Sequence, residues 1–270
     1  MRLGIGSFAY AWAVGVFGHE PAAPMTALDL VARAAALDVR LVQFGDNLPL
    51  QELSHEELHT LATRAEALRV GIEVGTRGIA PEHLMRYLDL AGFFGSPIVR
   101  VVIDTDEHQP GEDEVVRTLA PLMRDFERSG VVLAIENHDR FGAATLAGII
   151  KAIDSPSIGI CLDTINSLGA LEGPREVIAT LAPWVVNLHI KDVIIRRSNE
   201  TMGFVVEGRP AGEGMIDIPA LLAEMNAKAR QPDAILELWP PSRAALAEAI
   251  AIEAGWVESS IRYLRQLIAE

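Results

Sequence analysis

The stretch VVLAIENHDR, residues 131–140, joins five apolar residues to a cluster of metal-binding and hydrogen-bonding side chains. A continuous apolar run of this length is typical of a strand that is buried on both faces, as in a parallel sheet. The same transition recurs in IGICLDTIN (158–166), VVNLHIKD (185–192) and AILELW (234–239). We therefore expect a fold in which neighbouring buried strands end in polar side chains.

Eight apolar runs of this kind alternate with helical patterns along the chain. They begin at residues 3, 39, 70, 98, 131, 158, 185 and 234, so the first seven lie 27 to 36 residues apart. A strand followed by a helix needs about 30 residues. Eight such units predict an α/β fold, a closed (β/α)8 TIM barrel formed by residues 1–270 as a single domain. An open doubly wound sheet is the alternative, but GIGSFAYAW (4–12) lacks the spacing of its phosphate-binding turn.

The segments between the runs show helix-boundary signals. Thr26 and Ser54 are each followed three residues later by an acidic residue, which is the capping-box pattern. Asp217 precedes IPALLAEMNAKA in the position of an N-cap. The last amphipathic segment, residues 242–268, is predicted to be helical and to break near Gly255.

Composition limits the classes of partner. The net charge is −14 and the pI is about 4.9. Such a field repels phosphate backbones, and the longest basic stretch is two residues, so we expect no nucleic-acid partner. The single cysteine, Cys161, excludes an internal disulfide and fits a reducing cytoplasm. The early uncharged run, residues 3–18, is too short to span a membrane, so we expect no membrane association.

Candidate metal ligands follow the last four apolar runs. Glu136, Asp163, His189 and Glu237 stand at the ends of four consecutive predicted strands. In a TIM barrel the chemistry lies at the C-terminal ends of the strands, where these side chains can converge. Three carboxylates and one imidazole suit a divalent cation such as Mn²⁺, Mg²⁺ or Co²⁺, with Zn²⁺ as a further choice.

Each of these residues alone has an ordinary structural explanation. A single glutamate at a strand end is usually solvated, and a lone histidine is usually a hydrogen-bonded core residue. As a set, however, three buried carboxylates without a cation would be costly, because buried charges need partners. The set therefore favours a metal site.

The stretches AIENH, ICLDTIN, LHIKD and LELW, with GRPAGEGMIDIPALL between the last two, resemble the sugar phosphate isomerase/epimerase family, whose fold is the xylose isomerase-like TIM barrel. The resemblance covers nearly the whole chain in the order of its elements. It implies that Glu136, Asp163, His189 and Glu237 bind one divalent metal ion, most often Mn²⁺. It also implies that the two glutamates flank the substrate and exchange protons with it, so Glu136 and Glu237 are the expected catalytic residues.

The chemistry of that family explains the residue types. Isomerising or epimerising a keto sugar requires removal of a proton next to a carbonyl, for which a positioned base supplies about 3 to 5 kcal/mol. A divalent metal stabilises the resulting enediolate by several kcal/mol more. We therefore expect a metal-dependent isomerase or epimerase that acts on a small sugar or sugar derivative.

Two residues lie two positions beyond a ligand and share its face if the strand continues. His138 follows Glu136 and is expected to contact a substrate hydroxyl, the alternative being a loop histidine. Lys191 follows His189 and is expected to hold a substrate oxygen, the alternative being an ion pair with Asp192 or another acid.

Two further substrate contacts come from less regular positions. Asn166 stands where some epimerases of the family carry a histidine, which puts their substrate choice in doubt here. The long gap between His189 and Glu237 contains GFVVEGRPAG (203–212), which is predicted to form a hairpin and cover the barrel mouth. Arg209 from this segment is the expected contact, the alternative being a solvated surface arginine.

Other functions use the same residues. A lyase or dehydratase acting on a keto sugar, keto-inositol or 3-keto-glycoside passes through the same enediolate, so the ligand set alone does not separate it from an isomerase. A metal-dependent endonuclease would need more histidines at the strand ends and a basic face. A non-catalytic sugar-binding barrel is disfavoured by the intact Glu136 and Glu237. A dimer or tetramer of the chain fits the resemblance.

Overall fold

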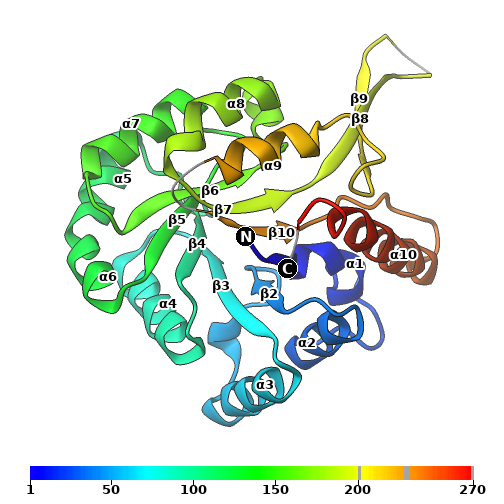
Figure 1. The fold of residues 1–270 in the computed structure, drawn as a ribbon, viewed down its shortest axis with the longest axis horizontal. Helices are drawn as coiled ribbons and strands as arrows, with labels where there is room; N and C mark the ends of the chain where they lie inside the picture. The colour runs from blue at the N-terminus through cyan, green and yellow to red at the C-terminus, as the bar shows by residue number, and fades with distance from the viewer. Residues whose placement is uncertain (200–201, 228–230, 269–270) are drawn as a thin grey trace.

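The computed structural model describes residues 1–199, 202–227 and 231–268, and it shows the predicted closed barrel (Figure 1). Eight parallel strands form the barrel in the order β1-β10-β7-β6-β5-β4-β3-β2. The strands are β1 (Leu3–Gly6), β2 (Leu41–Phe44), β3 (Gly71–Arg77), β4 (Ile98–Val102), β5 (Val132–Glu136), β6 (Ile158–Asp163), β7 (Val185–Ile190) and β10 (Asp233–Leu236). Each lies within or next to one of the eight apolar runs, so the single (β/α)8 barrel is confirmed.

The helices form the outer layer around the barrel (Figure 1). They are α1 (Ala11–Val14), α2 (Ala27–Ala36), α3 (His55–Leu68), α4 (Pro81–Phe94), α5 (Glu112–Leu119), α6 (Met123–Ser129), α7 (Ala143–Ile153), α8 (Pro174–Leu181), α9 (Ile218–Asn226) and α10 (Leu246–Leu264). The capping boxes at Thr26 and Ser54 are present, and the side chain of Asp217 accepts the N–H of Ala220. These side-chain bonds satisfy backbone donors that a helix start leaves unpaired.

The predicted break near Gly255 is wrong. Helix α10 runs without interruption from Leu246 to Leu264. A glycine inside a helix costs only about 1 kcal/mol relative to alanine. Here Val257, Ile261 and Leu264 bury the inner face of the helix, and this packing outweighs the cost.

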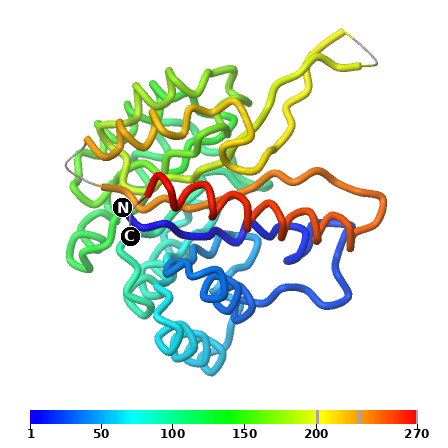
Figure 2. The backbone as a smooth tube through the Cα atoms, turned by 45° about the vertical axis from the view of Figure 1, so that its right-hand side comes forward, coloured from blue at the N-terminus to red at the C-terminus, as the bar shows by residue number. Residues whose placement is uncertain are grey.

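The two ends of the chain meet where the barrel closes. Strand β1 pairs with β10 through the partners Leu3 and Ala234, and α10 lies beside the first segment of the chain (Figure 2). Arg2 strengthens this seam, because its backbone N–H and its guanidinium both donate to Asp233. The N-terminal strand is thereby fixed before it reaches the barrel mouth.

An antiparallel hairpin interrupts the last strand–helix unit. It consists of β8 (Asp192–Arg197) and β9 (Phe204–Arg209), which begin with the pairing of Asp192 and Arg209. The hairpin predicted in 203–212 supplies only the second strand, β9, and the first strand, β8, comes earlier in the chain, directly after β7. The hairpin projects away from the barrel instead of covering the mouth (Figures 1 and 2).

Asp192 anchors the base of this hairpin. Its Oδ2 accepts the backbone N–H groups of Gly212 and Gly214, both at 2.9 Å, and its Oδ1 accepts that of Ile216 at 3.1 Å. A Cβ atom at Gly214 would lie 2.0 Å from Oδ1 of Asp192, so only glycine allows this close approach. The glycine-rich stretch therefore wraps around one carboxylate.

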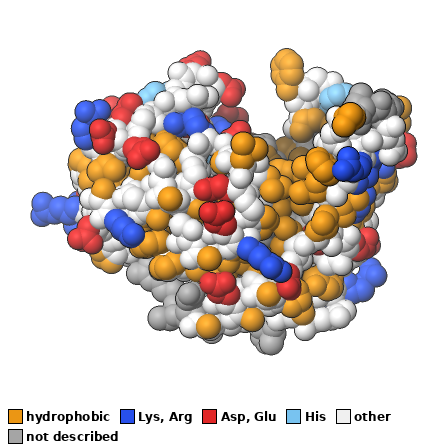
Figure 3. Space-filling view, turned by 90° about the horizontal axis from the view of Figure 1, so that it is seen from above, with side chains coloured by type: hydrophobic (Ala, Val, Ile, Leu, Met, Phe, Trp, Pro, Cys, Tyr) orange, Lys and Arg blue, Asp and Glu red, His pale blue; other side chains and the backbone are white. Residues whose placement is uncertain are grey.

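Charged side chains are scattered over the face of the molecule that Figure 3 shows. On the face seen in Figure 3, acidic and basic side chains alternate with hydrophobic ones, and the described residues form no continuous basic patch there. Among the described helices, none has both the length and the apolar composition needed to cross a lipid bilayer. The absence of a nucleic-acid partner stays a prediction.

Candidate metal centre

The four predicted ligands converge at the mouth of the barrel. Glu136 ends β5, Asp163 ends β6, His189 lies near the end of β7, and Glu237 directly follows β10. These strands are neighbours in the barrel. All four residues are buried, and none is more than 3 % exposed. The sequence pattern therefore correctly predicted that these four side chains lie together.

One ring nitrogen of His189 faces this group without a hydrogen-bond partner. Its Nδ1 lies 3.5 Å from Oε2 of Glu136 and 3.4 Å from Oε1 of Glu237. It is one of two buried side-chain polar atoms in the described part of the chain that make no hydrogen bond. Asp163, His189 and Glu237 each place one possible ligand atom in this group, and the three atoms lie within 4.8 Å of one another. A divalent cation would satisfy this donor set.

The electrostatics of His189 also fit a cation. Burial alone would disfavour a charged imidazole, but the acidic groups around it, including Glu237 and Glu136, raise the pKa of His189 well above its ordinary value. The position therefore attracts positive charge, which a metal ion can supply in place of a proton.

Two cationic side chains lie against the same carboxylates. Nζ of Lys191 lies 2.7 Å from Oδ2 of Asp163 and 2.9 Å from Oε2 of Glu237. Nε of Arg100 donates to the carboxylate of Glu136. Burial would raise the pKa of Glu136, but Arg100, with help from His189 and Lys191, holds it well below the ordinary value. Each glutamate of the site is thus paired with a buried cation.

Cys161 lies beside the cluster but keeps its thiol proton. Its Sγ donates to Oδ1 of Asn187 at 3.4 Å, and burial raises its pKa to about 11. A thiol in this state is a poor metal ligand. Cys161 is therefore an inert core residue.

A pocket of about 410 Å³ opens above the cluster. One side is apolar and contains Phe8, Trp12 and Trp239, which together suit the apolar face of a sugar. The polar lining consists of Arg77, Arg100, Glu136, His138, Asn166, Lys191 and Glu237. The pocket therefore combines an apolar wall with several charged groups at its base.

Three of the four predicted substrate contacts line this pocket. They are His138, Asn166 and Lys191. Nδ2 of Asn166 donates to Oε1 of Glu136 at 2.7 Å, so this side chain also orients a candidate ligand. Arg209 is placed elsewhere: on β9 it donates to the carbonyl of Gly208 and to the carboxylate of Glu207, and it is not part of the lining. Arg209 lies at the base of the hairpin, opposite Asp192, and its side chain pairs with Glu207.

A model of the xylose isomerase-like TIM barrel matches residues 31–267. The chain belongs to this family. A curated relative, 3-oxo-isoapionate decarboxylase of Pectobacterium atrosepticum, is 33 % identical over 264 residues, which cover 98 % of this chain and 95 % of the relative. The chain is therefore an enzyme-family member with a lyase among its relatives.

Solved structures confirm the fold of this xylose isomerase-like barrel. A D-psicose 3-epimerase determined with D-fructose superposes with a TM-score of 0.72 over 100 % of both chains, at 15 % identity. A xylose isomerase-like barrel from Mycobacterium smegmatis, determined in complex with magnesium, superposes with a TM-score of 0.69 over 96 % of this chain and 97 % of the other, at 16 % identity. Likeness at this level of identity shows the shared architecture.

Three charged residues of the pocket region were missed by sequence reasoning. Arg100 lies in the middle of β4, and Nη1 of its guanidinium lies 3.0 Å from Oδ1 of Asp46. Arg77 ends β3 and pairs with the other oxygen of Asp46. The signal was a single arginine inside the apolar run IVRVVI (98–103), which is unusual for a strand buried on both faces.

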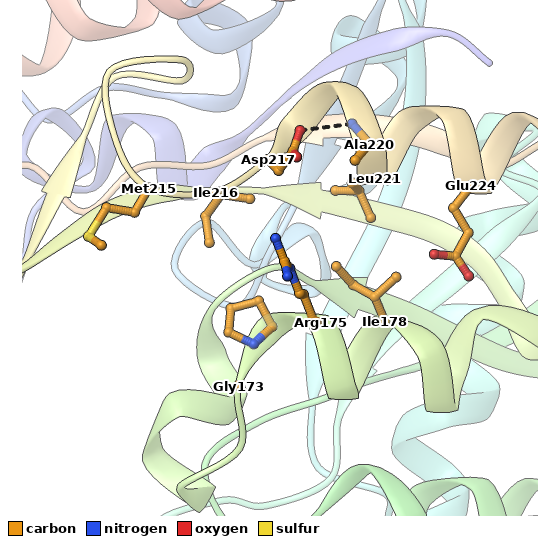
Figure 4. Close-up of a pocket in the computed structure, with 10 residues that line it drawn as sticks. Gly173, Arg175, Ile178, Met215, Ile216, Asp217, Ala220, Leu221 and Glu224 are labelled. Carbon is orange, nitrogen blue, oxygen red and sulfur yellow. Dashed lines mark hydrogen bonds between the residues drawn. The ribbon is translucent and has the colours of Figure 1, made fainter.

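A larger hollow of this xylose isomerase-like barrel lies away from the cluster. It has a volume of about 640 Å³ and runs along the outer layer between α8 and α9 (Figure 4). Ile178 and Leu221 face each other across it, and Arg175 points from α8 toward α9. None of the four candidate ligands lines it, so its size does not mark it as the reactive site.

Proposed function

We propose that the protein is a divalent-metal-dependent decarboxylase that acts on a 3-oxo acid derived from a sugar. The observation that supports this choice is the pairing of both site glutamates with buried cations, Glu136 with Arg100 and Glu237 with Lys191. An epimerase needs these glutamates as bases, whereas decarboxylation of a 3-oxo acid needs a sink for electrons and no base.

The charge of the cluster fits an anionic substrate. Glu136, Asp163 and Glu237 contribute three negative charges, and Arg100 and Lys191 contribute two positive ones, so one negative charge remains. The neighbouring pair of Asp46 and Arg77 is neutral as a whole. A divalent ion would turn the remainder into one positive charge, which a single substrate carboxylate neutralises. A neutral ketose would leave this charge uncompensated in a buried site.

Glu136, Asp163, His189 and Glu237 are the residues that would hold the metal. When bound, the ion would act as a Lewis acid on the substrate carbonyl, which is worth several kcal/mol. Mn²⁺, Mg²⁺ or Co²⁺ suits these ligands, and the magnesium found with the Mycobacterium smegmatis barrel supports an ion of this kind.

The remaining residues bind and orient the substrate. Arg77, with a side chain that is 34 % exposed at the pocket, offers donors to the substrate carboxylate. Trp12 and Trp239 shelter the apolar face of the substrate and limit the access of water. When the C1–C2 bond breaks, CO₂ leaves and the electron pair passes toward the 3-oxo oxygen, where the positive charge of Lys191 favours it. C2 then takes up one proton from solvent.

The named relative supports the same reaction type. The decarboxylase of Pectobacterium atrosepticum matches almost the whole chain at 33 % identity, and its name describes a 3-oxo acid substrate. Among the functions compatible with the ligand set, this relative favours a lyase over an isomerase.

Isomerisation or epimerisation of a sugar is the second candidate. It is favoured by the position of Glu136 and Glu237. Their carboxylate oxygens lie 3.5 and 3.4 Å from Nδ1 of His189, and both side chains line the same pocket. Two carboxylates beside one substrate can exchange protons with it. The epimerase with the same fold is consistent with this candidate.

One experiment separates the two candidates. The protein is incubated with Mn²⁺ in deuterated water, with 3-oxo sugar acids in one series and neutral ketoses in another, and ¹³C and ¹H NMR follow the products. We expect release of one CO₂ per ketone formed and one deuteron at the product carbon that was C2 of the substrate, next to the ketone. Deuterium exchange or epimerisation of a neutral ketose without CO₂ release would overturn the decarboxylase and establish the second candidate.

A further inference from the structure

A row of buried, hydrogen-bonded polar side chains inside the barrel leads to His189. We propose that Gln43, oriented by Glu73 and Asn187, is a positioning residue that fixes the ring of His189 so that Nδ1 presents its lone pair to the metal. This inference rests on the proposed metal centre, but it does not depend on which reaction the centre performs.

This row of polar side chains crosses the interior of the barrel from β2 and β3 to β7. Gln43 on β2 and Glu73 on β3 are register partners, and Asn187 lies on β7 on the same strand face as His189. All of these residues are at most 2 % exposed. Nε2 of His189 and Oε1 of Gln43 are 2.6 Å apart. The imidazole is therefore held on the side opposite to the ligand cluster.

The direction of each hydrogen bond follows from Glu73. An ionised carboxylate only accepts, so both amides must turn their nitrogen atoms toward it. Nε2 of Gln43 donates to Oε2 of Glu73 at 2.9 Å, and Nδ2 of Asn187 donates to the same oxygen at 3.0 Å. Nε2 of Gln43 also donates to Oδ1 of Asn187 at 3.0 Å. Only Oε1 of Gln43 is left for His189.

This orientation decides which ring nitrogen of His189 is protonated. Because Oε1 of Gln43 accepts, Nε2 of His189 must donate its N–H. In the neutral ring the lone pair then lies on Nδ1, the atom without a partner that faces Glu136 and Glu237. The opposite tautomer would present a hydrogen atom to the metal. A partner of this kind on a metal-bound histidine is typically worth about 10- to 100-fold in metal affinity.

The test measures Mn²⁺ affinity by titration calorimetry and needs no turnover. Burial raises the pKa of Glu73 to about 7, so the titrations are made at pH 8, where its carboxylate is ionised. We expect Gln43→Leu to bind Mn²⁺ about 10- to 100-fold more weakly than the wild type. Gln43→Asn, which is one methylene shorter and keeps a buried amide, should weaken binding in the same way and serves if the leucine variant does not fold.

A reciprocal exchange provides the rescue. In the double variant Gln43→Glu/Glu73→Gln, position 43 still accepts from Nε2 of His189, and position 73 supplies the donor. We expect its Mn²⁺ affinity to return to within about 3-fold of the wild type. Loss of affinity through general loosening of the core would not be restored by this exchange.

The outcomes separate the inference from the proposed function. Folded Gln43→Leu and Gln43→Asn proteins that bind Mn²⁺ as tightly as the wild type would overturn the role of Gln43 and leave the metal centre intact. A wild-type protein that binds neither Mn²⁺, Mg²⁺ nor Co²⁺ would overturn both. In the Mg²⁺-loaded wild type, we also expect a slowly exchanging Nε2–H resonance of His189 that is absent from Gln43→Leu.

Discussion

Nζ of Lys191 lies 2.7 Å from Oδ2 of Asp163, and both side chains are buried at the barrel mouth. The same ammonium group lies 2.9 Å from Oε2 of Glu237, so it occupies space between two candidate ligands. We predict that Lys191→Met reduces kcat by about 100-fold or more, because the substrate loses a buried positive charge that opposes the developing negative charge. Steady-state kinetics with Mn²⁺ measures this loss.

The metal affinity of the same variant should change in the opposite direction. Removal of an ammonium group beside the ligands lowers the repulsion of an incoming cation, so Mn²⁺ should bind Lys191→Met at least as tightly as the wild type. Lys151→Met is the matched control, because Lys151 is exposed and lies over the ring of Trp184 on the outside of the barrel. Parallel losses of turnover and metal affinity in Lys191→Met would contradict a role in the chemistry.

Glu237→Gln removes one negative charge from the candidate ligand set and preserves its shape. We predict that Mn²⁺ affinity falls by about 10-fold or more and that turnover falls with it, since an amide is a weaker ligand for a hard cation than a carboxylate. Glu258→Gln, at an exposed position of α10, should change neither quantity. A Glu237→Gln protein that binds Mn²⁺ normally and keeps full turnover would exclude this residue from the site.

Arg100→Gln tests the contribution of the buried ion pairs to stability. Arg100 is paired with Glu136 and with Asp46, and its side chain is only 4 % exposed. Breaking a buried pair by removing one partner typically costs about 3 to 5 kcal/mol, because the remaining charge stays buried. We therefore expect the free energy of unfolding of the metal-free protein, measured in urea, to fall by about that amount.

The surface pair of Arg140 and Asp104 offers the comparison. The side chain of Arg140 is 31 % exposed, and such pairs contribute about 0 to 1 kcal/mol. Arg140→Gln should therefore lower the free energy of unfolding by no more than about 1 kcal/mol. A loss of no more than about 1 kcal/mol in Arg100→Gln as well would mean that the pairs of Arg100 do not stabilise the fold.

The parts of the site that the sequence predicted share one property. Glu136 and Asp163 end an apolar run, so a change from apolar to polar marks both the end of the strand and the ligand. Because parallel strands of a barrel end on one face, convergence followed from the fold alone. The same reasoning located the eight strands, whose apolar runs are set by burial on both faces.

Two of the residues that were missed lie inside strands. Gln43 and Arg100 occupy central positions of β2 and β4, where strand periodicity gives no reason to expect a polar side chain. Their importance depends on partners on other strands, His189 and Glu136, which lie far away in the sequence. Arg209 shows the reverse case: the sequence predicted a hairpin, but the direction in which it projects depends on the anchoring of Asp192.

Glu253 on α10 provides a prediction that does not depend on the metal. Its carboxylate accepts the backbone N–H groups of Trp12 and Ala13 at 2.8 and 3.0 Å, and burial raises its pKa from 4.5 to about 7. Between these pH values the folded protein keeps a proton that the unfolded chain has lost. The contribution of Glu253 to the free energy of unfolding therefore decreases as the pH rises from about 4.5 through 7.

Glu253→Gln removes this dependence because glutamine does not titrate. We expect the difference in unfolding free energy between wild type and variant to shift by about 2 kcal/mol in favour of the variant between pH 5 and 8. The absolute difference also includes the hydrogen bond that is lost when an amide replaces the carboxyl group, and this part is the same at every pH. Glu248→Gln, at an exposed residue of the same helix, should follow the wild-type pH profile in urea unfolding. If the Glu253→Gln profile runs parallel to that of the wild type, the carboxylate of Glu253 does not take up a proton in this range.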